Sequence, residues 1–229
     1  TFGIGQGDCQ AEIRRMTFRS THLTITFENE TEEFEFPMAG EHNVLNALAA
    51  IAATSCQGIS LKKACQALSS FQGVPGRLEI VNVSKQVHVF VDYAHTPDAL
   101  ESVLNTLIKI RSATKRSCHI HCLFGCGGDR DIGKRPMMGE IACRLSDSVW
   151  ITSDNPRSED PQNILNQIVA GCHGQKPVKV EVDRKKAIQE ALKTAKPGDV
   201  LLIAGKGHEN YQIIGSIKHP FSDIECVEE

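Results

Sequence analysis

Residues 118–128 read Cys-His-Ile-His-Cys-Leu-Phe-Gly-Cys-Gly-Gly, an apolar run that ends in a glycine loop. Similar short runs, rich in β-branched residues, occur on both sides of it: Val87–Val91, Val149–Ile151, Val178–Val182 and Val200–Ile203. Runs of this length and composition are typical of buried β-strands. The sequence therefore predicts five strands in the second half of the chain.

Segments with helical periodicity separate these strands. Leucine occurs at positions 100, 104 and 107, and further helices are expected over Met137–Leu145, Ile164–Ala170 and Lys186–Lys193. This alternation predicts an α/β fold, a mostly parallel sheet with helices on both faces. Ligands of such sheets bind beyond the carboxyl ends of the strands, so the loops after residues 91, 124, 151, 182 and 203 form the candidate site.

The first 75 residues follow a different pattern. Two strands and two helices are expected there: His22–Phe27, Glu33–Phe36, His42–Thr54 and Leu61–Phe71. The polar residues Glu28 to Thr31 suggest a hairpin, and Ser60 is a candidate helix N-cap. A turn-rich break at Gly73–Gly76 divides the chain into domains 1–75 and 76–229. Two strands are too few for a complete nucleotide-binding sheet, so the first part is expected to be the end of a larger domain.

Composition narrows the class of function. The chain has 229 residues, 41% of them hydrophobic, with 25 basic and 28 acidic side chains and a net charge of −3. This balance argues against a protein that coats nucleic acid or an anionic membrane, and no apolar run reaches the roughly 18 residues that span a bilayer. Nine scattered cysteines, an odd number, favour a reduced, cytoplasmic protein.

The loop after Val91 reads Asp92-Tyr-Ala-His-Thr-Pro-Asp98. Asp92 could hold a ribose hydroxyl, and Tyr93 or His95 could stack on a base. The same residues equally suit the start of a helix, with Pro97 at its first position. Both interpretations stay open on this stretch alone.

The loop after Phe124 contains Gly128–Arg135, which nearly matches the phosphate-binding pattern G-x-x-x-x-G-K-[ST]. Arg135 stands where that pattern needs a magnesium-binding hydroxyl, so a standard phosphate loop is rejected. The turn is instead expected to present Arg130, Lys134 and Arg135 to an anionic ligand, or to be a solvated run of charges.

Three cysteines and two histidines near this loop raise the question of a metal site. On a strand, Cys118 and Cys122 share one face while His119 and His121 share the other, so the set cannot converge on one ion. The close cysteine pairs of zinc sites are also absent. No metal ligands are therefore expected in this chain.

The loop after Ile151 contains Asp154-Asn-Pro-Arg157. Arg157 offers a planar, bidentate donor for a carboxylate. Asp154 and Asn155 can bind amines and hydroxyls, or can make an Asx-turn before the proline.

The loop after Ile203 contains Gly205-Lys-Gly-His-Glu209. Its glycines allow the backbone to approach a ligand closely, and Glu209 could pair with an ammonium group. Lys206 could be a surface group. Two guanidinium groups, Arg130 and Arg157, together with the Glu209 carboxylate would complement a zwitterionic amino acid.

These loops belong to a series of motifs that occur in a fixed order. They are Gly40-Glu-His-Asn-Val-Leu-Asn46, Gly76-Arg-Leu-Glu79, Asp92–Asp98, Gly127-Gly-Asp-Arg-Asp131, Asp154–Arg157 and Gly205–Glu209. The series resembles the central-to-C-terminal segment of the Mur ligases, and the last three motifs are similar to those of members that add 2,6-diaminopimelate. The resemblance covers nearly the whole chain from about residue 20. It implies a Rossmann-like C-terminal domain, preceded by the end of a central ATP-binding domain.

The resemblance also implies a reaction. ATP phosphorylates the D-glutamate side chain of a UDP-sugar dipeptide, and an amine of meso-diaminopimelate then attacks the acyl phosphate. The family's phosphate loop, its Mg²⁺ ligands and its UDP-sugar-binding domain have no counterpart in this sequence. We therefore expect a C-terminal fragment of the ligase that is inactive alone.

The family's binding residues carry over onto two groups of positions. The resemblance implies that ATP is contacted by Asn43, Asn46, Arg77, Asp92 and His95, with Asp92 on the ribose. It implies that diaminopimelate is held by Arg130, Asp154, Asn155, Arg157, Gly205 and Glu209. Arg157 would grip the distal carboxylate and Glu209 the ammonium beside it. Lysine lacks that carboxylate and would leave Arg157 unpaired, so diaminopimelate is the expected substrate.

Two other classes of function compete with this interpretation. One is a free-standing amino-acid-binding module without chemistry. The other is a related ligase that adds lysine or resembles folylpolyglutamate or cyanophycin synthetase. We do not expect the Asp154–Arg157 and Gly205–Glu209 motifs together in those synthetases.

Overall fold

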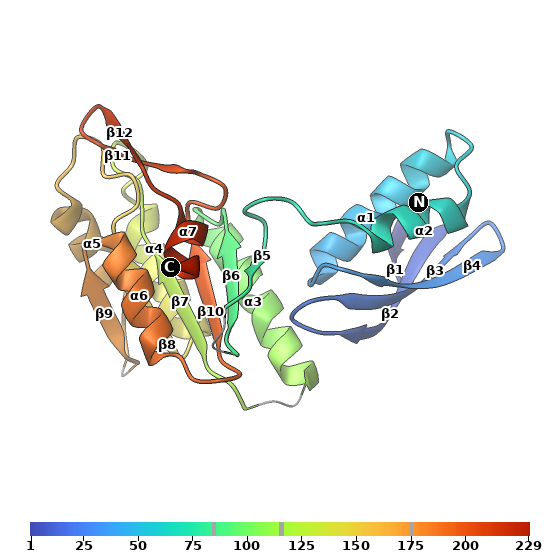
Figure 1. Ribbon diagram of the computed structural model, residues 1–229, viewed down its shortest axis with the longest axis horizontal. Coiled ribbons are helices and arrows are strands. Elements are labelled where there is room, and N and C mark those ends of the chain that lie inside the picture. Colours follow the sequence, from blue (N-terminus) through green and yellow to red (C-terminus); the bar gives the residue numbers. More distant parts are fainter. Residues whose placement is uncertain (84–85, 115–116, 175) are drawn as a thin grey trace. The chain divides into compact units, whose positions relative to one another are not determined.

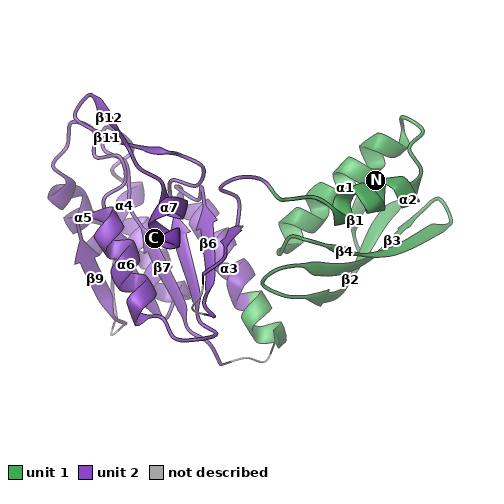
Figure 2. Cartoon of the chain, viewed as in Figure 1, with its two compact units in different colours: residues 1–73, 109–116 green, residues 74–108, 117–229 purple. Residues whose placement is uncertain are grey.

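A computed structural model describes residues 1–83, 86–114, 117–174 and 176–229. The chain forms two compact units (Figure 2). Unit 1 comprises residues 1–73 and 109–116, and unit 2 comprises residues 74–108 and 117–229. Within the described part of the chain, no helix combines the length and the apolar character needed to cross a membrane.

Unit 1 is a four-stranded sheet packed against two helices (Figure 1). The strands lie in the order β1 (Phe2–Ile4), β2 (Cys9–Met16), β3 (Thr21–Phe27) and β4 (Glu30–Phe36). β2, β3 and β4 are antiparallel, and β1 pairs parallel to β2. The helices are α1 (Glu41–Ser55) and α2 (Leu61–Ser69). Their apolar faces close a core with alternate residues of the strands, including Leu23, Ile25, Val44, Leu48 and Ile51.

The structure corrects three predictions for unit 1. β1 and β2 were not predicted. The hairpin is tighter than expected, because Glu28 and Asn29 both have positive φ (47° and 70°) and make a two-residue turn that lets β4 begin at Glu30. α2 ends at Ser69, two residues before Phe71, and Ser60 occupies its N-cap position without a capping hydrogen bond from its side chain.

Unit 2 contains a six-stranded sheet in the order β5-β6-β10-β7-β8-β9. The strands are β5 (Glu79–Val81), β6 (His88–Asp92), β7 (Ile120–Phe124), β8 (Ser148–Thr152), β9 (Val178–Glu181) and β10 (Val200–Ala204). All neighbours are parallel except the edge strand β5, which runs antiparallel to β6. The predicted α/β fold and its five parallel strands are therefore confirmed, and β5 is an addition.

Helices cover both faces of this sheet (Figure 1). The elements outside the sheet are α3 (Pro97–Thr114), α4 (Lys134–Leu145), α5 (Pro161–Val169), α6 (Arg184–Thr194), the hairpin β11 (Tyr211–Ile214) with β12 (Ile217–Pro220), and α7 (Asp223–Glu228). α6 and α7 pack on one face against a cluster that includes Trp150, Leu201 and Ile203. α4 and α5 pack together against β8. The loops that follow β6, β7, β8 and β10 therefore meet at one edge of the sheet.

Candidate functional site

A cavity of about 380 Å³ lies at the carboxyl ends of the parallel strands in unit 2. The predicted amino-acid-binding residues all line it: Arg130, Asp154, Asn155, Arg157, Gly205 and Glu209. Tyr93, His95 and Lys134 contribute to the same wall. The residues that the sequence analysis grouped into one site therefore do lie around one cavity. The role of each residue stays a prediction.

The backbone fixes Arg157 firmly at this cavity. Its φ of 50° is left-handed, and its N–H donates to the carbonyl of Ile213 at 3.1 Å. Its own carbonyl accepts the N–H of Gly215 at 2.8 Å, so the β11–β12 hairpin holds the residue on both sides. Its guanidinium donates through Nη1 to the carbonyl of Gly128 at 2.8 Å and, at 3.5 Å, to the carbonyl of Asn155. A guanidinium has five N–H donors, so Arg157 can still offer a bidentate edge to a carboxylate.

The glycine loop after β7 packs directly on the loop after β8. The N–H of Gly128 donates to the carbonyl of Asn155 at 2.9 Å. A Cβ atom on Gly128 would stand 1.9 Å from the carbonyl oxygen of Pro156, so only glycine fits. Arg130 follows on this loop, exposed, and its Nη1 donates to the carbonyl of Asp129 at 2.9 Å. The close contact sets the spacing between the two arginines that line the cavity.

Arg135 does not belong to the ligand-facing cations, and its predicted role was wrong. Its side chain is fully buried at the start of α4 and donates from Nη1 and Nη2 to the two carboxylate oxygens of Glu159, each at 2.8 Å. It also donates to Gln167 at 2.6 Å. The guanidinium therefore joins α4 to the loop and helix after β8. Lys134 does line the cavity, and its ammonium donates to the carbonyl of His95 at 2.8 Å.

Lys206 is buried, which contradicts its interpretation as a surface group. Its ammonium lies 2.9 Å from Oε2 of Glu209 and 3.3 Å from Oδ1 of Asn155. Asn155 Nδ2 donates to the same Glu209 oxygen at 2.9 Å. Desolvation raises the pKa of Glu209, but the bonds from Asn155 and Lys206 outweigh it and hold that pKa below its usual value. The carboxylate predicted to bind an ammonium group thus already has a cation.

A signal for this pair was present in the sequence. Lys206 comes immediately after the apolar strand β10 and its glycine, and it stands three residues before Glu209, a spacing at which side chains can pair. A lysine at the end of a fully buried strand is expected to need a partner, because a buried ammonium is costly unless it is paired.

Asp154 is a second acidic group of the cavity wall, and it is more deeply buried than Glu209. Its pKa is raised by desolvation, against the opposing attraction of Arg184 and Lys206. Gly205 lies against it with a φ of 111°, and a Cβ atom there would stand 2.8 Å from Oδ2 of Asp154. The cavity therefore combines a half-buried arginine with a buried carboxylate, an arrangement that suits a ligand carrying both charges.

The predicted nucleotide-binding residues are divided between the two units. In unit 1, Asn43 is buried and its Nδ2 donates to the carbonyl of Ala39 at 2.7 Å, while Asn46 is exposed on the same helix. The other three, Arg77, Asp92 and His95, belong to unit 2. The structure does not bring the five residues together in one unit.

Asp92 organises the turn after β6. Its Oδ2 accepts the N–H of Leu78 at 2.7 Å, and its Oδ1 accepts the N–H of Ala94 at 2.8 Å. The carboxylate thus ties the turn after β6 to the turn before β5.

An aromatic group lies beside this turn. The Tyr93 ring is 4.7 Å from the ring of His95 and 5.3 Å from that of His208, between centroids. The exposed guanidinium of Arg77 lies 5.2 Å from the Tyr93 centroid. Gly76 makes the packing possible, because a Cβ atom there would stand 2.2 Å from the backbone nitrogen of His208. Flat, half-exposed rings with a nearby cation are suited to a nucleobase.

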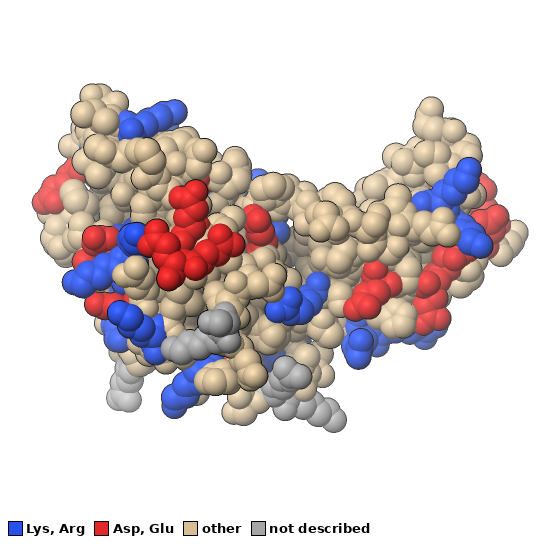
Figure 3. All heavy atoms as spheres, viewed as in Figure 1, with Lys and Arg blue, Asp and Glu red and all other residues tan. Residues whose placement is uncertain are grey.

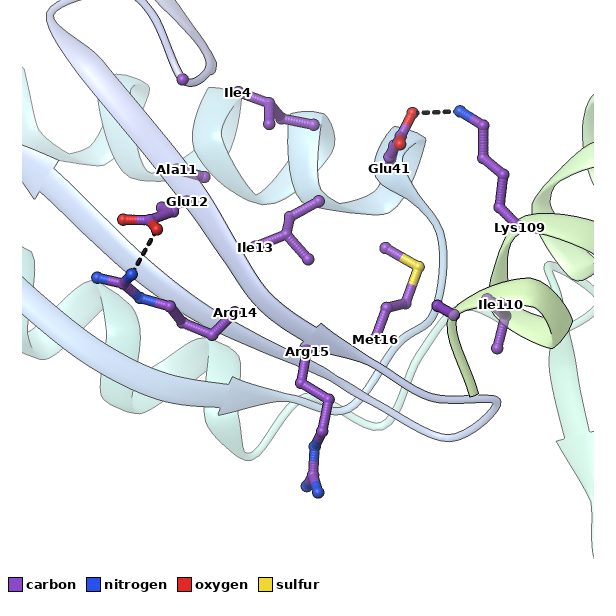
Figure 4. A pocket seen from close by; sticks show the side chains of 12 residues that line it. Ile4, Ala11, Glu12, Ile13, Arg14, Arg15, Met16, Glu41, Lys109 and Ile110 are labelled. Atoms are coloured by element: carbon purple, nitrogen blue, oxygen red, sulfur yellow. Dashed lines mark hydrogen bonds and ion pairs between the residues drawn. The ribbon is translucent and has the colours of Figure 1, made fainter. Parts of the chain in front are cut away.

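Unit 1 has a separate cavity of about 550 Å³, lined mainly by β1, β2 and the end of α3 (Figure 4). Lys109 and Glu41 form an ion pair at 2.7 Å at its rim. Neither Asn43 nor Asn46 lines it. This cavity therefore holds none of the predicted site residues.

Charge and metal-ligand patterns add little to the site. On the face drawn in Figure 3, side chains of both signs are interspersed, with acidic groups gathered over α7. Over residues 1–83, 86–114, 117–174 and 176–229, no three His, Cys, Asp or Glu side chains are grouped so that they could hold a metal ion. The nine cysteines are free thiols.

Comparison with known proteins gives two family matches. The model described as "Mur ligase, glutamate ligase domain" matches residues 76–207. The model described as "Mur ligase middle domain" matches residues 1–54. The two matches follow each other along the chain.

Several curated proteins are similar over most of the chain. A UDP-N-acetylmuramoyl-L-alanyl-D-glutamate–2,6-diaminopimelate ligase of Chromobacterium violaceum is 44% identical over 229 residues, which are 100% of this chain and 46% of the relative. The ligase of that name from Synechococcus elongatus is 50% identical over 203 residues, covering 88% and 40% respectively. The chain spans about half the length of the curated relatives it matches.

Solved structures agree with the sequence matches. A 2,6-diaminopimelate ligase of the same name is 35% identical with a TM-score of 0.74, over 99% of this chain and 46% of that one. A UDP-N-acetylmuramate-alanine ligase from Thermotoga maritima, 24% identical with a TM-score of 0.65 over 90% and 44%, shares the fold. Because the glutamate ligase domain model alone matches more than half of the residues, this chain belongs to the Mur ligase family.

Proposed function

We propose that this chain is the amino-acid-selecting part of an ATP-dependent amide ligase. The ligase would add meso-diaminopimelate to UDP-N-acetylmuramoyl-L-alanyl-D-glutamate during synthesis of a peptidoglycan precursor in the cytoplasm. Family membership, the names of the relatives and the residues around the cavity support the proposal. Residues 1–75 would be the last part of the central ATP-binding domain, and residues 76–229 the C-terminal domain.

In the proposed reaction, the terminal phosphoryl group of ATP moves to the side-chain carboxylate of D-glutamate and ADP is released. An amine of diaminopimelate attacks the acyl carbon, a C–N bond forms, and the bond to phosphate breaks. The residues of unit 2 would contribute by holding the incoming amino acid with its amine in a fixed position. Among the described residues, no three His, Cys, Asp or Glu side chains are grouped to hold a metal ion, and the role proposed for unit 2 does not depend on one.

One observation carries the choice of substrate. Arg157 lies in the cavity wall with its backbone held by the β11–β12 hairpin and with guanidinium donors to spare. A carboxylate at the far end of diaminopimelate would pair with it. Lysine has no such group and would leave the half-buried guanidinium without a partner. The nucleoside part of ATP is proposed to contact Arg77, Asp92 and His95, and Asn43 and Asn46 stay predictions for unit 1.

Calorimetric titration with meso-diaminopimelate and with L-lysine, each with and without ATP, tests the proposal. We expect diaminopimelate to bind, lysine to give no heat, and Arg157→Ala to weaken binding by about 10-fold to 100-fold. Arg144→Ala is the matched control, because Arg144 is an exposed arginine that pairs with Glu101 outside the cavity. Equal binding of the two amino acids, unchanged in Arg157→Ala, would show that the substrate is misassigned.

A free-standing binding module makes a different prediction from a ligase. A module would bind the amino acid with the same affinity whether or not ATP is present. Affinity that changes on addition of ATP would favour the ligase, because His95, which is proposed to contact the nucleotide, lines the cavity, and Asp92 precedes Tyr93 of the same wall.

A further inference from the structure

A buried ion pair lies behind the cavity, outside its wall. Arg184 is the first residue of α6 and is 1% exposed, and Asp223 of α7 is 0% exposed. Arg184 Nε donates to Oδ1 of Asp223 at 2.7 Å, and Nη2 donates to Oδ2 at 2.8 Å. A buried pair of this kind adds little stability over two well-packed apolar side chains, because both charges lose their hydration. The pair therefore calls for another role.

Arg184 reaches from this pair toward the cavity. Its Nη2 also donates to the carbonyl of Ala204 at 3.0 Å, and the next residue, Gly205, lines the cavity. Its Nη1 is buried and has no hydrogen-bond partner among the described residues. Asp154 contacts the same segment, because its Oδ2 is 2.8 Å from the place where a Cβ atom of Gly205 would stand. Arg184 is the strongest of the attractions that oppose protonation of Asp154.

Three carboxylates, Asp154, Glu209 and Asp223, share the two buried cations Arg184 and Lys206, so this group has one carboxylate in excess. Arg184 is matched by Asp223, and Lys206 is matched by Glu209 at 2.9 Å. Asp154 has no cation of its own at ion-pair distance among the described residues, although both buried cations act on it. A buried carboxylate in that position needs a counter-ion, and a ligand with an ammonium group would supply one.

We propose that Arg184 is a positioning residue, anchored from behind by Asp223, that keeps the Asp154 carboxylate ionised and directed into the cavity as the counter-charge for the ammonium group of the amino acid. The identity of that ligand rests on the function proposed above. The effect of Arg184 on Asp154 does not, and it can be measured without any ligand.

The first test is the titration of the Asp154 carboxylate by carbon-detected NMR in the unliganded chain, with Asp154→Asn used to assign the signal. The charged and titratable groups that act on it are Arg184 of α6, Asp223 of α7, Lys206 and Glu209 after β10, and Cys126 after β7. Two variants alter the Arg184–Asp223 pair and should shift the pKa of Asp154 in opposite directions. Arg184→Met/Asp223→Leu removes both charges as an apolar pair, which is compatible with folding. Asp223→Asn removes the anion and leaves the cation.

The expected shifts have opposite signs. The double variant removes the cation with the larger effect on Asp154 together with the anion with the smaller effect, so the pKa of Asp154 should rise, by about one unit or more. Asp223→Asn should lower it, because Arg184 then acts alone. Arg184→Lys keeps a cation at this position and should restore most of the wild-type value. A loss of packing would not move the two variants in opposite directions, so equal or absent shifts would overturn the proposal.

The second test is the affinity for meso-diaminopimelate between pH 4 and pH 8. Binding needs ionised Asp154, so it should disappear as the pH falls through the pKa of that group. The pH of half-maximal affinity should be higher in Arg184→Met/Asp223→Leu and lower in Asp223→Asn. If the carboxylate titrates as expected but diaminopimelate fails to bind the wild-type protein, the substrate assignment is wrong and the electrostatic role stands. If the wild-type protein binds and neither variant changes the pH profile, the positioning role is wrong.

Discussion

The buried ammonium of Lys206 lies 2.9 Å from Oε2 of Glu209, three residues further along the loop after β10. Lys206 is completely buried, whereas the Glu209 side chain is 16% exposed and lines the cavity. An incoming ammonium group would have to compete with Lys206 for this carboxylate. Asp154 is the better acceptor, because no cation is fixed on it at ion-pair distance among the described residues.

Replacing Lys206 by methionine should destabilise unit 2 by about 3 kcal/mol at neutral pH, because Glu209 and Asn155 lose their buried cation. The difference should shrink in acid, where Glu209 becomes protonated in both proteins. Urea unfolding followed by the fluorescence of Trp150, the single tryptophan, measures this. Lys134→Met is the control, since Lys134 lines the same cavity but makes its bond to the carbonyl of His95 at the protein surface. An equal loss in both variants would contradict the special position of Lys206.

A methyl group at Gly205 should damage the cavity and the backbone together. The φ of 111° is strained for alanine, at a cost of about 1–3 kcal/mol, and the new Cβ atom would press on Oδ2 of Asp154. We expect Gly205→Ala to weaken diaminopimelate binding by at least about tenfold, as one displaced charge-assisted contact would. Gly215→Ala shares the positive φ (60°) but meets no atom within 4 Å, so it should cost stability without affinity. Calorimetry on both variants separates the effect of backbone strain from the effect of a Cβ atom that presses on Asp154.

The Arg135–Glu159 pair should make stability depend on acid pH. Hydrogen bonds from Arg135 and from the backbone N–H of Asp129 lower the pKa of Glu159 from 4.5 to about 2. A carboxyl group whose pKa is lower in the folded than in the unfolded state stabilises the folded state wherever the pH is above the unfolded pKa. For Glu159 this contribution is therefore complete above pH 4.5 and is lost as the pH falls toward 2. Glu159→Gln should therefore lower the melting temperature at pH 7 and match the wild type near pH 2. A constant difference across that range would refute the assignment.

Asp199, which immediately precedes β10, should be essential for stability at the amino ends of the strands, opposite the cavity. Its carboxylate accepts the backbone N–H groups of His119 at 2.8 Å and Lys196 at 2.9 Å, and it lies 3.2 Å from Nε2 of His121. Asp199→Ala would leave these donors without their acceptor, which should cost about 2–4 kcal/mol. Asp199→Asn keeps one carbonyl oxygen, so its stability should lie between those of the wild type and Asp199→Ala. Thermal unfolding measures the series, and a fully stable alanine variant would disprove the role.

The strands that carried enough apolar side chains were predictable. β6, β7, β8 and β10 are buried on both faces, so their near-continuous apolar runs identified them. β1, β5 and the β11–β12 hairpin lie at edges or outside the main sheets, and β2 carries a register shift between Ile13 and Arg15. Their patterns are too short or too polar to distinguish strand from loop.

The candidate site was predictable to the extent that it depends on topology. Parallel strands bring the loops that follow them to one edge, so the residues after β7, β8 and β10 were expected to meet, and they line one cavity. Which cations are instead buried by an acidic partner was not predictable. Arg135 and Arg184 are buried by partners 24 and 39 positions away, Glu159 and Asp223, and such pairing depends on how helices pack. Binding by these residues stays a prediction for the experiments above.

The position of β10 also sets the order of events during folding. β10 lies between β6 and β7, yet 75 residues (125–199) separate β7 from β10 along the chain, and more than a hundred separate β6 from β10. A ribosome therefore releases β10 after the other five strands of this sheet, so β6 and β7 are made before the strand that pairs with both of them. The chain must close long loops before β10 can pair with β6 and β7. This requirement slows folding and leaves intermediates that are prone to aggregate. Unit 2 should thus fold only after β10 has been synthesised, and truncation before Val200 should remove the whole sheet rather than one strand.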